Sequence, residues 1–322
     1  MVVCLVTIIT SCKKNMPDNQ QALIPGSVPY VQASGLYIPG IVPVVDSIND
    51  AAVWKDGSIF SLSNKNSTCN AMTIVGNDVY IVGWCGSDMV YWKNSVISTP
   101  LYSPGGILAK DVTGIAVMGN DVYVSGLIVQ KSDNREYPVY WKNGNLVYLK
   151  SDPGYLTGSG TRGIAVSGND VYILGDWAGN AIYWKNEVVN VLPNNSRFAY
   201  SITTSGNDVY ILGKVDDPNV KFNQLAAYWK NGVITYLNTN IYYPMQIAVK
   251  GNDVYVCGNL LGVHWYGVYL KNNILTNLGK DSGTVASYIC VDNNNNVYLA
   301  GTVLNISGSA VPLIGKMAFQ QY

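Results

Sequence analysis

Charged residues are scarce in this chain. They make up 12% of its 322 residues, against about 25% in an average soluble protein. There are two glutamates, Glu136 and Glu187, and a single histidine, His264. Residues that favour helices are therefore few, whereas Val, Ile, Trp and the 24 tyrosines favour strands. We predict an all-β protein.

The composition also excludes several classes of protein. The formal net charge is zero, whereas a nucleic-acid-binding protein would show an excess or a patch of basic residues. No apolar run reaches about 18 residues, so no helix is predicted to span a membrane. A single histidine and the lack of a Cys-x-x-Cys pair argue against a zinc site, and there is no Gly-x-Ser-x-Gly motif. We expect no cofactor, no metal and no nucleic-acid partner.

The N-terminus has the features of a lipoprotein leader. Residues 2–11 are apolar or small, and Cys12 is followed by Lys13 and Lys14. The string that ends at Cys12 resembles the lipobox, in which the cysteine is lipidated, and it is similar to the leader ends of Bacteroides-type envelope lipoproteins. No basic segment precedes the apolar stretch, so either the start lies upstream or the leader is truncated. The alternative is a frayed apolar terminus with an ordinary cysteine.

This resemblance implies three segments and a location. Residues 1–12 are the predicted signal peptide, 13–27 a polar tether, and 28–322 the folded domain. The protein is then expected in the cell envelope, lipid-anchored to the outer membrane, in the periplasm or at the surface. The anchor is its one expected membrane contact, and we expect a monomer.

Two strings recur along the folded domain. Gly-Asn-Asp-Val-Tyr occurs five times, and two weaker copies complete a set of seven aligned tyrosines: Tyr37, Tyr80, Tyr123, Tyr172, Tyr210, Tyr255 and Tyr298. Tyr-Trp-Lys-Asn or a variant follows each copy and aligns seven lysines: Lys55, Lys93, Lys142, Lys185, Lys230, Lys271 and Lys316. Each unit of about 43 residues contains four β-prone segments separated by turn residues.

Seven such units predict a seven-bladed β-propeller with four antiparallel strands per blade, named A to D from the centre outwards. Six or eight blades are the alternatives. The strings resemble the NHL type of propeller repeat and the HAF repeat of extracellular bacterial proteins, which implies an architecture and little about activity. The fourth strand of the last blade is expected either from the tail that ends at Tyr322 or from residues 20–25.

Residues that recur in every blade are predicted to be structural. The A–B and C–D turns of a four-stranded meander lie at the same end, so each repeated Asp is expected beside the Lys of its own blade. Asp78 with Lys93 is the first such pair, and an exposed pair of this kind is worth roughly 0.2–1 kcal/mol. The five motif tryptophans are predicted to pack between sheets.

The cysteines allow one further prediction. Export permits disulfides, and an uninterrupted hairpin in the second blade would bring Cys69 opposite Cys85. We predict a disulfide there, with two buried thiols as the alternative. Cys257 and Cys290 fall in different blades and are predicted to be free.

The unusual residues gather at the opposite end of the blades, which we call the loop face because it holds the B–C loops and the D–A crossovers. Variable loops on a rigid scaffold are the usual place for function. The predicted binding residues are Trp84, Arg162, Asp176, Trp177, Arg197, Tyr200, Tyr243, His264 and Trp265. Aromatic rings beside a few charges suit a glycan or a peptide of a partner protein. The alternative is that these rings cover the apolar interiors of the loops.

We therefore expect a ligand-binding or protein-interaction scaffold rather than an enzyme. A carbohydrate-active hydrolase is the first alternative, because it needs two carboxylates about 5–9.5 Å apart at the mouth of the channel. Asp176, directly after a B strand, is the best placed acidic residue, yet one carboxylate is not a pair. A purely structural repeat protein is the remaining alternative.

Overall fold

The computed structural model describes residues 2–3, 36–43, 49–55, 58–63, 65–101, 104–149, 160–217, 219, 223–238, 241–261, 265–278, 284–304 and 310–317. All regular elements within these ranges are strands, and they form seven sheets. This part of the chain contains no helix of the length and apolarity needed to cross a membrane. The predicted signal peptide and tether, including Cys12, lie outside the described residues apart from Val2 and Val3.

The sheets follow one another in the order of the sequence. The first holds β1 (Val2–Val3), β2 (Leu36–Pro43), β3 (Asn49–Lys55) and β4 (Ser58–Ser61). The second and third hold β5 (Ser67–Val75), β6 (Asp78–Cys85), β7 (Asp88–Lys93), β8 (Val96–Pro100), β9 (Ile107–Met118), β10 (Asp121–Gln130), β11 (Arg135–Lys142) and β12 (Asn145–Tyr148). The fourth and fifth hold β13 (Gly160–Ser167), β14 (Asp170–Trp177), β15 (Asn180–Lys185), β16 (Val188–Val191), β17 (Ser196–Ser205), β18 (Asp208–Asp216), β19 (Gln224–Lys230) and β20 (Val233–Tyr236). The last two hold β21 (Tyr243–Lys250), β22 (Asp253–Leu261), β23 (Trp265–Lys271), β24 (Ile274–Asn277), β25 (Thr284–Val291), β26 (Val297–Leu304) and β27 (Ala310–Met317).

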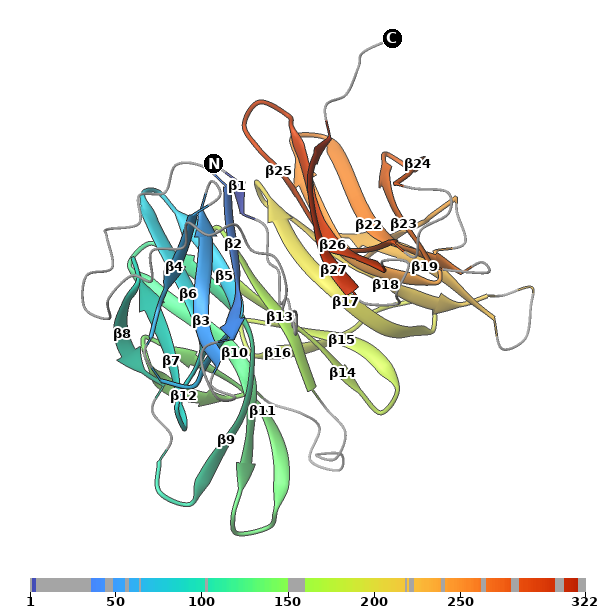
Figure 1. Cartoon of the computed structure of the whole chain (residues 1–322). Coiled ribbons are helices and arrows are strands. Elements are labelled where there is room, and N and C mark those ends of the chain that lie inside the picture. The colour runs from blue at the N-terminus through green and yellow to red at the C-terminus, as the bar shows by residue number, and fades with distance from the viewer. Residues whose placement is uncertain are drawn as a thin grey trace.

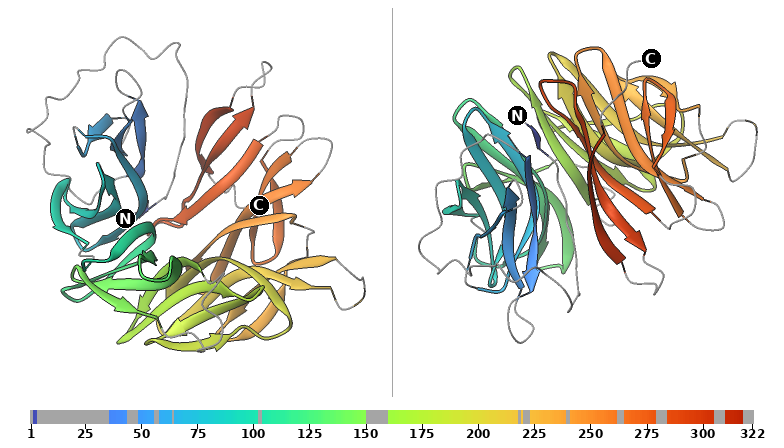
Figure 2. Two further views of the ribbon diagram at one scale, coloured as in Figure 1. Left: turned by 90° about the horizontal axis from the view of Figure 1, so that it is seen from below. Right: turned by 45° about the horizontal axis from the view of Figure 1, so that its top comes forward.

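These sheets are the seven blades of a β-propeller, as the repeats predict. Figure 1 and Figure 2 show the sheets succeeding one another around a common centre, with the first sheet and the last on neighbouring sides of the ring. The A strands lie innermost, and each of them packs against the A strand of the next blade from β5 to β25. Blades two to six are antiparallel four-stranded meanders.

The first and last blades depart from that plan. The inner strand of the first blade is β1, which runs parallel to β2. Within the described residues the last sheet has three strands, and both segments predicted to supply its fourth lie outside them. The two blades meet through an apolar cluster of Ile38 and Ala300, against which Trp54 and Tyr288 pack.

The repeated polar residues form one network in each of blades two to six. The predicted pairs of Asp and Lys are present in all five blades that carry the full string, with N–O distances of 2.7–2.8 Å. The Asn of the C–D turn joins them: its amide donates to the same Asp at 2.6–2.7 Å, and its oxygen accepts the N–H that follows this Asp. The two turns at this end of each blade are therefore tied together by side chains.

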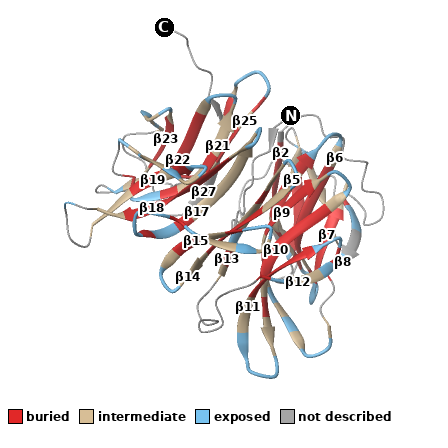
Figure 3. Ribbon diagram, turned by 180° about the vertical axis from the view of Figure 1, so that it is seen from behind, coloured by how far each residue is buried: buried red, intermediate tan, exposed pale blue. Residues whose placement is uncertain are grey.

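The repeated aromatic residues form the packing between blades. Trp92, Trp141, Trp184 and Trp229 are completely buried, while Trp54 is half-buried at the junction of the first and last blades. The strand-B tyrosines lie beneath the repeated lysines, whose ammonium groups are 5.2–5.5 Å from the ring centroids in blades one to six. Figure 3 shows the buried residues concentrated along the strands and the exposed ones in the turns. The structural role predicted for these residues is confirmed.

The predicted disulfide is wrong, because Cys69 and Cys85 are both free and buried. The hairpin pairs Val75 with Asp78, and a bulge between Cys69 and Ala71 shifts the register further, so that Cys69 lies opposite Gly83 rather than Cys85. The Cys69 thiol instead faces the carbonyl of Ala52, and burial raises its pKa to about 12. Cys257 and Cys290 are buried thiols outside any disulfide, as predicted.

Candidate functional site

A β-bulge interrupts every A strand from the second blade to the seventh. In each case one extra residue of the A strand lies opposite a glycine of the B strand. The bulged residues differ in chemistry from blade to blade: Asn70, Thr113, Arg162, Tyr200, Met245 and Ser287. Bulges re-aim a side chain and are frequent beside active sites. They lie here at the loop face, on the innermost strands.

The B-strand glycine explains why the bulge is possible. A Cβ at Gly175 would lie 2.3 Å from the carbonyl oxygen of Gly160 and 2.6 Å from the Trp184 ring. The backbone of the bulged strand thus occupies the space that a side chain would need. This glycine was visible in the sequence of every blade and is the signal by which the bulges could have been found.

A second position that differs in every blade is the residue directly after this glycine. Its side chain reaches the next blade: Asp176 faces the start of β17, Lys214 faces Tyr242 and Tyr243, and Asn259 hydrogen bonds the backbone of Ala286. Two of the equivalent residues, Trp84 and Leu127, are apolar. The loop face therefore carries two rings of non-repeated side chains on a repeated backbone.

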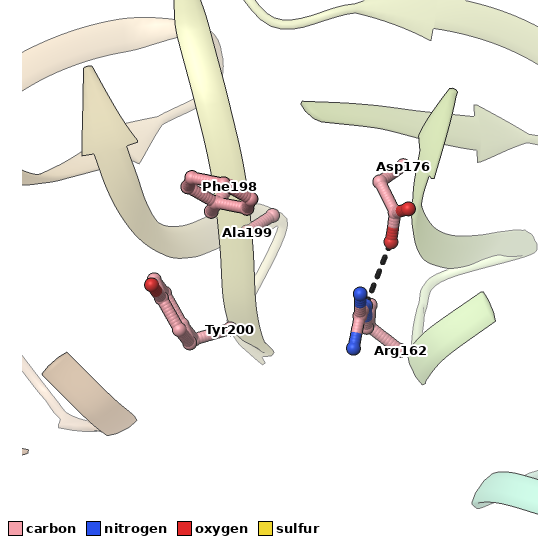
Figure 4. Close-up of a pocket in the computed structure, with 5 residues that line it drawn as sticks. All are labelled: Arg162, Asp176, Phe198, Ala199 and Tyr200. Carbon is pink, nitrogen blue, oxygen red and sulfur yellow. Dashed lines mark hydrogen bonds and ion pairs between the residues drawn. The ribbon is translucent and has the colours of Figure 1, made fainter. Parts of the chain in front are cut away.

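Arg162 and Asp176 form the charged side of a pocket between the fourth and fifth blades. The Arg162 Nε donates to the Asp176 carboxylate at 2.7 Å. Figure 4 shows this pair facing β17, which carries Phe198, Ala199 and Tyr200 on the other side of a pocket of about 130 Å³. Burial and the neighbouring Tyr243 raise the pKa of Tyr200, while Arg162 opposes them. The predicted residues Arg162, Asp176, Tyr200 and Tyr243 are thus brought together.

A larger pocket of about 390 Å³ adjoins the same arginine. Polar groups of the second, third and fourth blades line it, among them Asn70, Asp111, Thr113 and Thr161, and Arg162 lines it as well. Thr113 and Thr161 join two blades by a 2.8 Å hydrogen bond between their hydroxyl groups. Burial raises the pKa of Asp111, although the N–H of the next residue donates to this carboxylate. Asp111 is thus an acidic side chain at this pocket, in addition to Asp176 at the neighbouring one.

Lys214 is the functional candidate that sequence reasoning missed altogether. Its side chain is 7% exposed, and its ammonium lies 4.7 Å from the centroid of Tyr242 and 5.7 Å from that of Tyr243. Burial lowers the pKa of Lys214. The sequence shows that Lys214, like Asp176, directly follows the strand-B glycine of its blade. It does not show that Lys214 lacks a carboxylate partner among the described residues.

Other predicted residues lie apart from this group. Trp84 and Trp177 pack against the apolar clusters between neighbouring blades, which agrees with the alternative that some rings cover the loop interiors. Arg197 is held by the Asp216 carboxylate at 2.9 Å. His264 lies outside the described residues, and so does the side chain of Trp265, whose backbone begins β23.

Within the described ranges, no group of three or more His, Cys, Asp or Glu side chains is arranged to hold a metal ion. The charged and aromatic groups of blades four to six instead offer hydrogen bonds, one uncompensated cation and partly exposed rings. Phe198, Tyr242 and Tyr243 are 45%, 43% and 42% exposed. We call Arg162, Asp176, Phe198, Tyr200, Lys214, Tyr242 and Tyr243 the rim site.

Comparison with known proteins supports the architecture. No protein-family model and no curated protein sequence matches the chain. Among solved structures, a prolyl endopeptidase matches with a TM-score of 0.50 and 11% identity over 84% of this chain and 44% of its own. A post-proline cleaving enzyme from Rickettsia typhi covers 92% of this chain and 54% of its own, at 10% identity and a TM-score of 0.49. Trypanosoma rangeli sialidase in complex with sialic acid covers 85% and 56%, at 10% identity and a TM-score of 0.45.

This chain spans about half the length of these three solved structures. The similarity to the prolyl endopeptidase supports the propeller fold. At such low identity it carries no information about activity.

Proposed function

We propose that this protein is a lipid-anchored propeller of the cell envelope that binds a glycan at the rim site. The proposed anchor is Cys12, and its processing would remove Val2 and Val3, so the mature first blade would lack β1. The NHL-like and HAF-like repeats fit an extracellular or periplasmic scaffold. A peptide of a partner protein is the competing ligand. Both are compatible with a scaffold that acts by binding rather than by chemistry.

One observation carries the choice of a glycan: three partly exposed aromatic rings lie beside polar groups whose geometry is already set. Phe198, Tyr242 and Tyr243 present ring faces or edges to solvent, and the apolar C–H faces of a sugar ring pack well against them. Arg162 and Asp176 are held together at 2.7 Å, so they offer donors and acceptors at fixed positions for hydroxyl groups. Such pre-organised groups bind with less loss of side-chain entropy.

The test is an array of oligosaccharides and peptides probed with the purified protein. We expect glycans to bind, and we expect Phe198→Ala and Tyr243→Ala each to weaken the binding about tenfold, because truncated aromatic anchors typically cost more than 1 kcal/mol. Tyr236→Ala is the matched control, since Tyr236 is 41% exposed on the outer strand β20 of the same blade. Binding of peptides alone, or glycan binding that is unaffected by either rim variant, would contradict the proposal.

A specific observation also favours a second function, the hydrolysis of a glycan. Asp111 and Asp176 lie in two pockets that share Arg162 as a lining residue. Burial raises the pKa of Asp111, which suits a general acid, while Asp176, paired with Arg162, is the second acidic side chain and could act as base or nucleophile. We would assign the hydrolase function if a bound oligosaccharide were cleaved and both Asp111→Asn and Asp176→Asn abolished the cleavage.

A further inference from the structure

Lys214 differs from the lysines of the blade turns in having no acceptor among the described residues. Each of the five turn lysines has a carboxylate within 2.8 Å. Lys214 is 7% exposed, and in the described part of the chain no oxygen accepts a hydrogen bond from its ammonium group. An ammonium carries three N–H donors, and taking it out of water without an acceptor is costly.

Tyr242 and Tyr243 only partly compensate for this. Their rings meet edge to face with centroids 4.8 Å apart, and both lie within 5.7 Å of the Lys214 ammonium. A cation above an aromatic ring gains electrostatic energy, but the ring accepts none of the three N–H bonds in the way an oxygen does. The two rings therefore favour a cation at this position, but the described residues provide no oxygen acceptor for its N–H groups.

The ammonium can be reached from outside. Its nitrogen is not among the described polar atoms that are fully enclosed and lack a partner, and the two tyrosines beside it are more than 40% exposed. The nitrogen thus keeps some contact with solvent, from which an incoming oxygen can reach it. The pKa of Lys214 is lowered by burial, and an anion at this position would restore the stability of the charged form.

The charges of the neighbouring groups determine which charge a ligand at this position should carry. Arg162 is paired with Asp176, and Arg197 with Asp216. Lys214 is therefore the uncompensated cation among the described groups of the rim site, and it matches a single negative charge. We propose that Lys214, flanked by Tyr242 and Tyr243, is a subsite for the carboxylate of an acidic sugar. This inference rests on the proposed binding of a glycan at the rim site.

The experiment compares acidic oligosaccharides with their own methyl esters, which keep the sugar and remove the charge. The probes are oligogalacturonides, alginate oligomers and hyaluronan tetrasaccharide, with binding to the full chain measured by calorimetry. For at least one of them we expect the acid to bind about 10-fold to 100-fold more tightly than the ester, as for a hydrogen bond to a charged group. In Lys214→Met the acid and the ester should bind with similar affinity, while Lys214→Arg should retain most of the difference.

Lys131→Met provides the control, since Lys131 is an exposed lysine in the B–C turn of the third blade. It should leave the ratio of acid to ester affinity as in the wild type. Equal binding of acid and ester, or a difference that persists in Lys214→Met, would overturn the inference while leaving glycan binding intact. If no oligosaccharide binds, acidic or neutral, the proposed function itself fails and the inference fails with it.

Discussion

The ammonium of Lys93 lies 2.8 Å from the carboxylate of Asp78, and the same pair recurs in each of the next four blades. The Asp78 carboxylate also accepts from the Asn94 amide at 2.7 Å. One carboxylate thus joins the start of strand B to the end of strand C and to the turn that follows it. This network accounts for two repeated strings that are separate in the sequence.

The first prediction concerns acid. The hydrogen bond from Lys93, and then that from Asn94, lowers the pKa of Asp78 below its usual 3.8, and the equivalent carboxyls shift in the same direction. A carboxyl with a lower pKa in the folded state stabilises the fold above its unfolded pKa, and this contribution disappears as the pH falls through the folded pKa. We therefore expect the free energy of unfolding to fall steeply below about pH 4, as measured by urea unfolding from pH 7 to pH 2.

The matched variant for this prediction is Lys93→Met. It should cost less than about 1 kcal/mol at pH 7, since the pair is partly exposed, and it should make the acid transition shallower. An acid transition identical to that of the wild type would show that the blade networks are not its cause.

The second prediction separates the two roles of the turn asparagine. Asn272 has a φ of 50°, its oxygen accepts from the N–H of Val254 at 2.8 Å, and its amide donates to Asp253 at 2.6 Å. Asn272→Gly keeps the left-handed backbone and loses the hydrogen bonds, at a cost of about 1 kcal/mol. Asn272→Ala should cost about 1 kcal/mol more because alanine is strained at this φ. Equal urea midpoints for the two variants would show that backbone strain at this φ contributes little to the free energy of unfolding.

The third prediction is a gain in stability at Ser95. This residue has a φ of 67°, and its hydroxyl is fully enclosed without a partner among the described residues. The equivalent turn positions in the third and fifth blades are Gly144 and Gly232, both with a φ of 83°. Ser95→Gly should therefore raise the free energy of unfolding by about 1 kcal/mol or more. Ser95→Ala removes only the hydroxyl and should gain less, and a loss of stability in Ser95→Gly would refute the argument.

Most of the fold could be predicted because the residues that determine a blade lie close together in the sequence and recur in each following blade. The Asp, Lys and Trp positions recur with the blade period, so one blade explains the others. The bulges were not predicted, since they depend on a close approach between the strand-B glycine and the backbone of strand A. The wrong disulfide has this cause in part: the turn pairs Val75 with Asp78, and the bulge between Cys69 and Ala71 shifts Cys69 one residue further, opposite Gly83.

The candidate site was predicted in part for a related reason. Arg162, Asp176, Tyr200 and Tyr243 are chemically unlike their equivalents in other blades, and a comparison of the units reveals them. Lys214 is equally unlike its equivalents, but what distinguishes it is the set of groups around it. Those groups come from the next blade, and no local pattern in the sequence shows that an acceptor is missing.

The fourth prediction concerns the junction of the ring. Ile38 is buried against Ala300, where the first and last blades meet. Ile38→Ala should cost about 2–4 kcal/mol and should speed hydrogen exchange in β2 and β26 more than in β14. Ile173→Ala, a buried isoleucine of β14, is the control and should affect the middle blades instead. Uniform loss of protection in both variants would indicate that the ring unfolds as one unit and has no weaker junction.

The fifth prediction is that Lys214 lowers the stability of the fold that carries it. Its buried ammonium has no oxygen acceptor in the described structure, so Lys214→Met should raise the free energy of unfolding by about 1 kcal/mol or more at pH 7. Because burial lowers its pKa in the folded state, the unfolded chain binds the proton more tightly. The cost should therefore shrink as the pH rises from the lowered pKa towards the ordinary value of 10.5. Urea unfolding of the wild type and of Lys214→Met across this pH range measures the difference in their free energies of unfolding. If Lys214→Met were the less stable protein, the contact of the ammonium with Tyr242 and Tyr243 would outweigh the cost of desolvation. A residue that costs stability and sits at an exposed aromatic surface is better explained by binding than by folding.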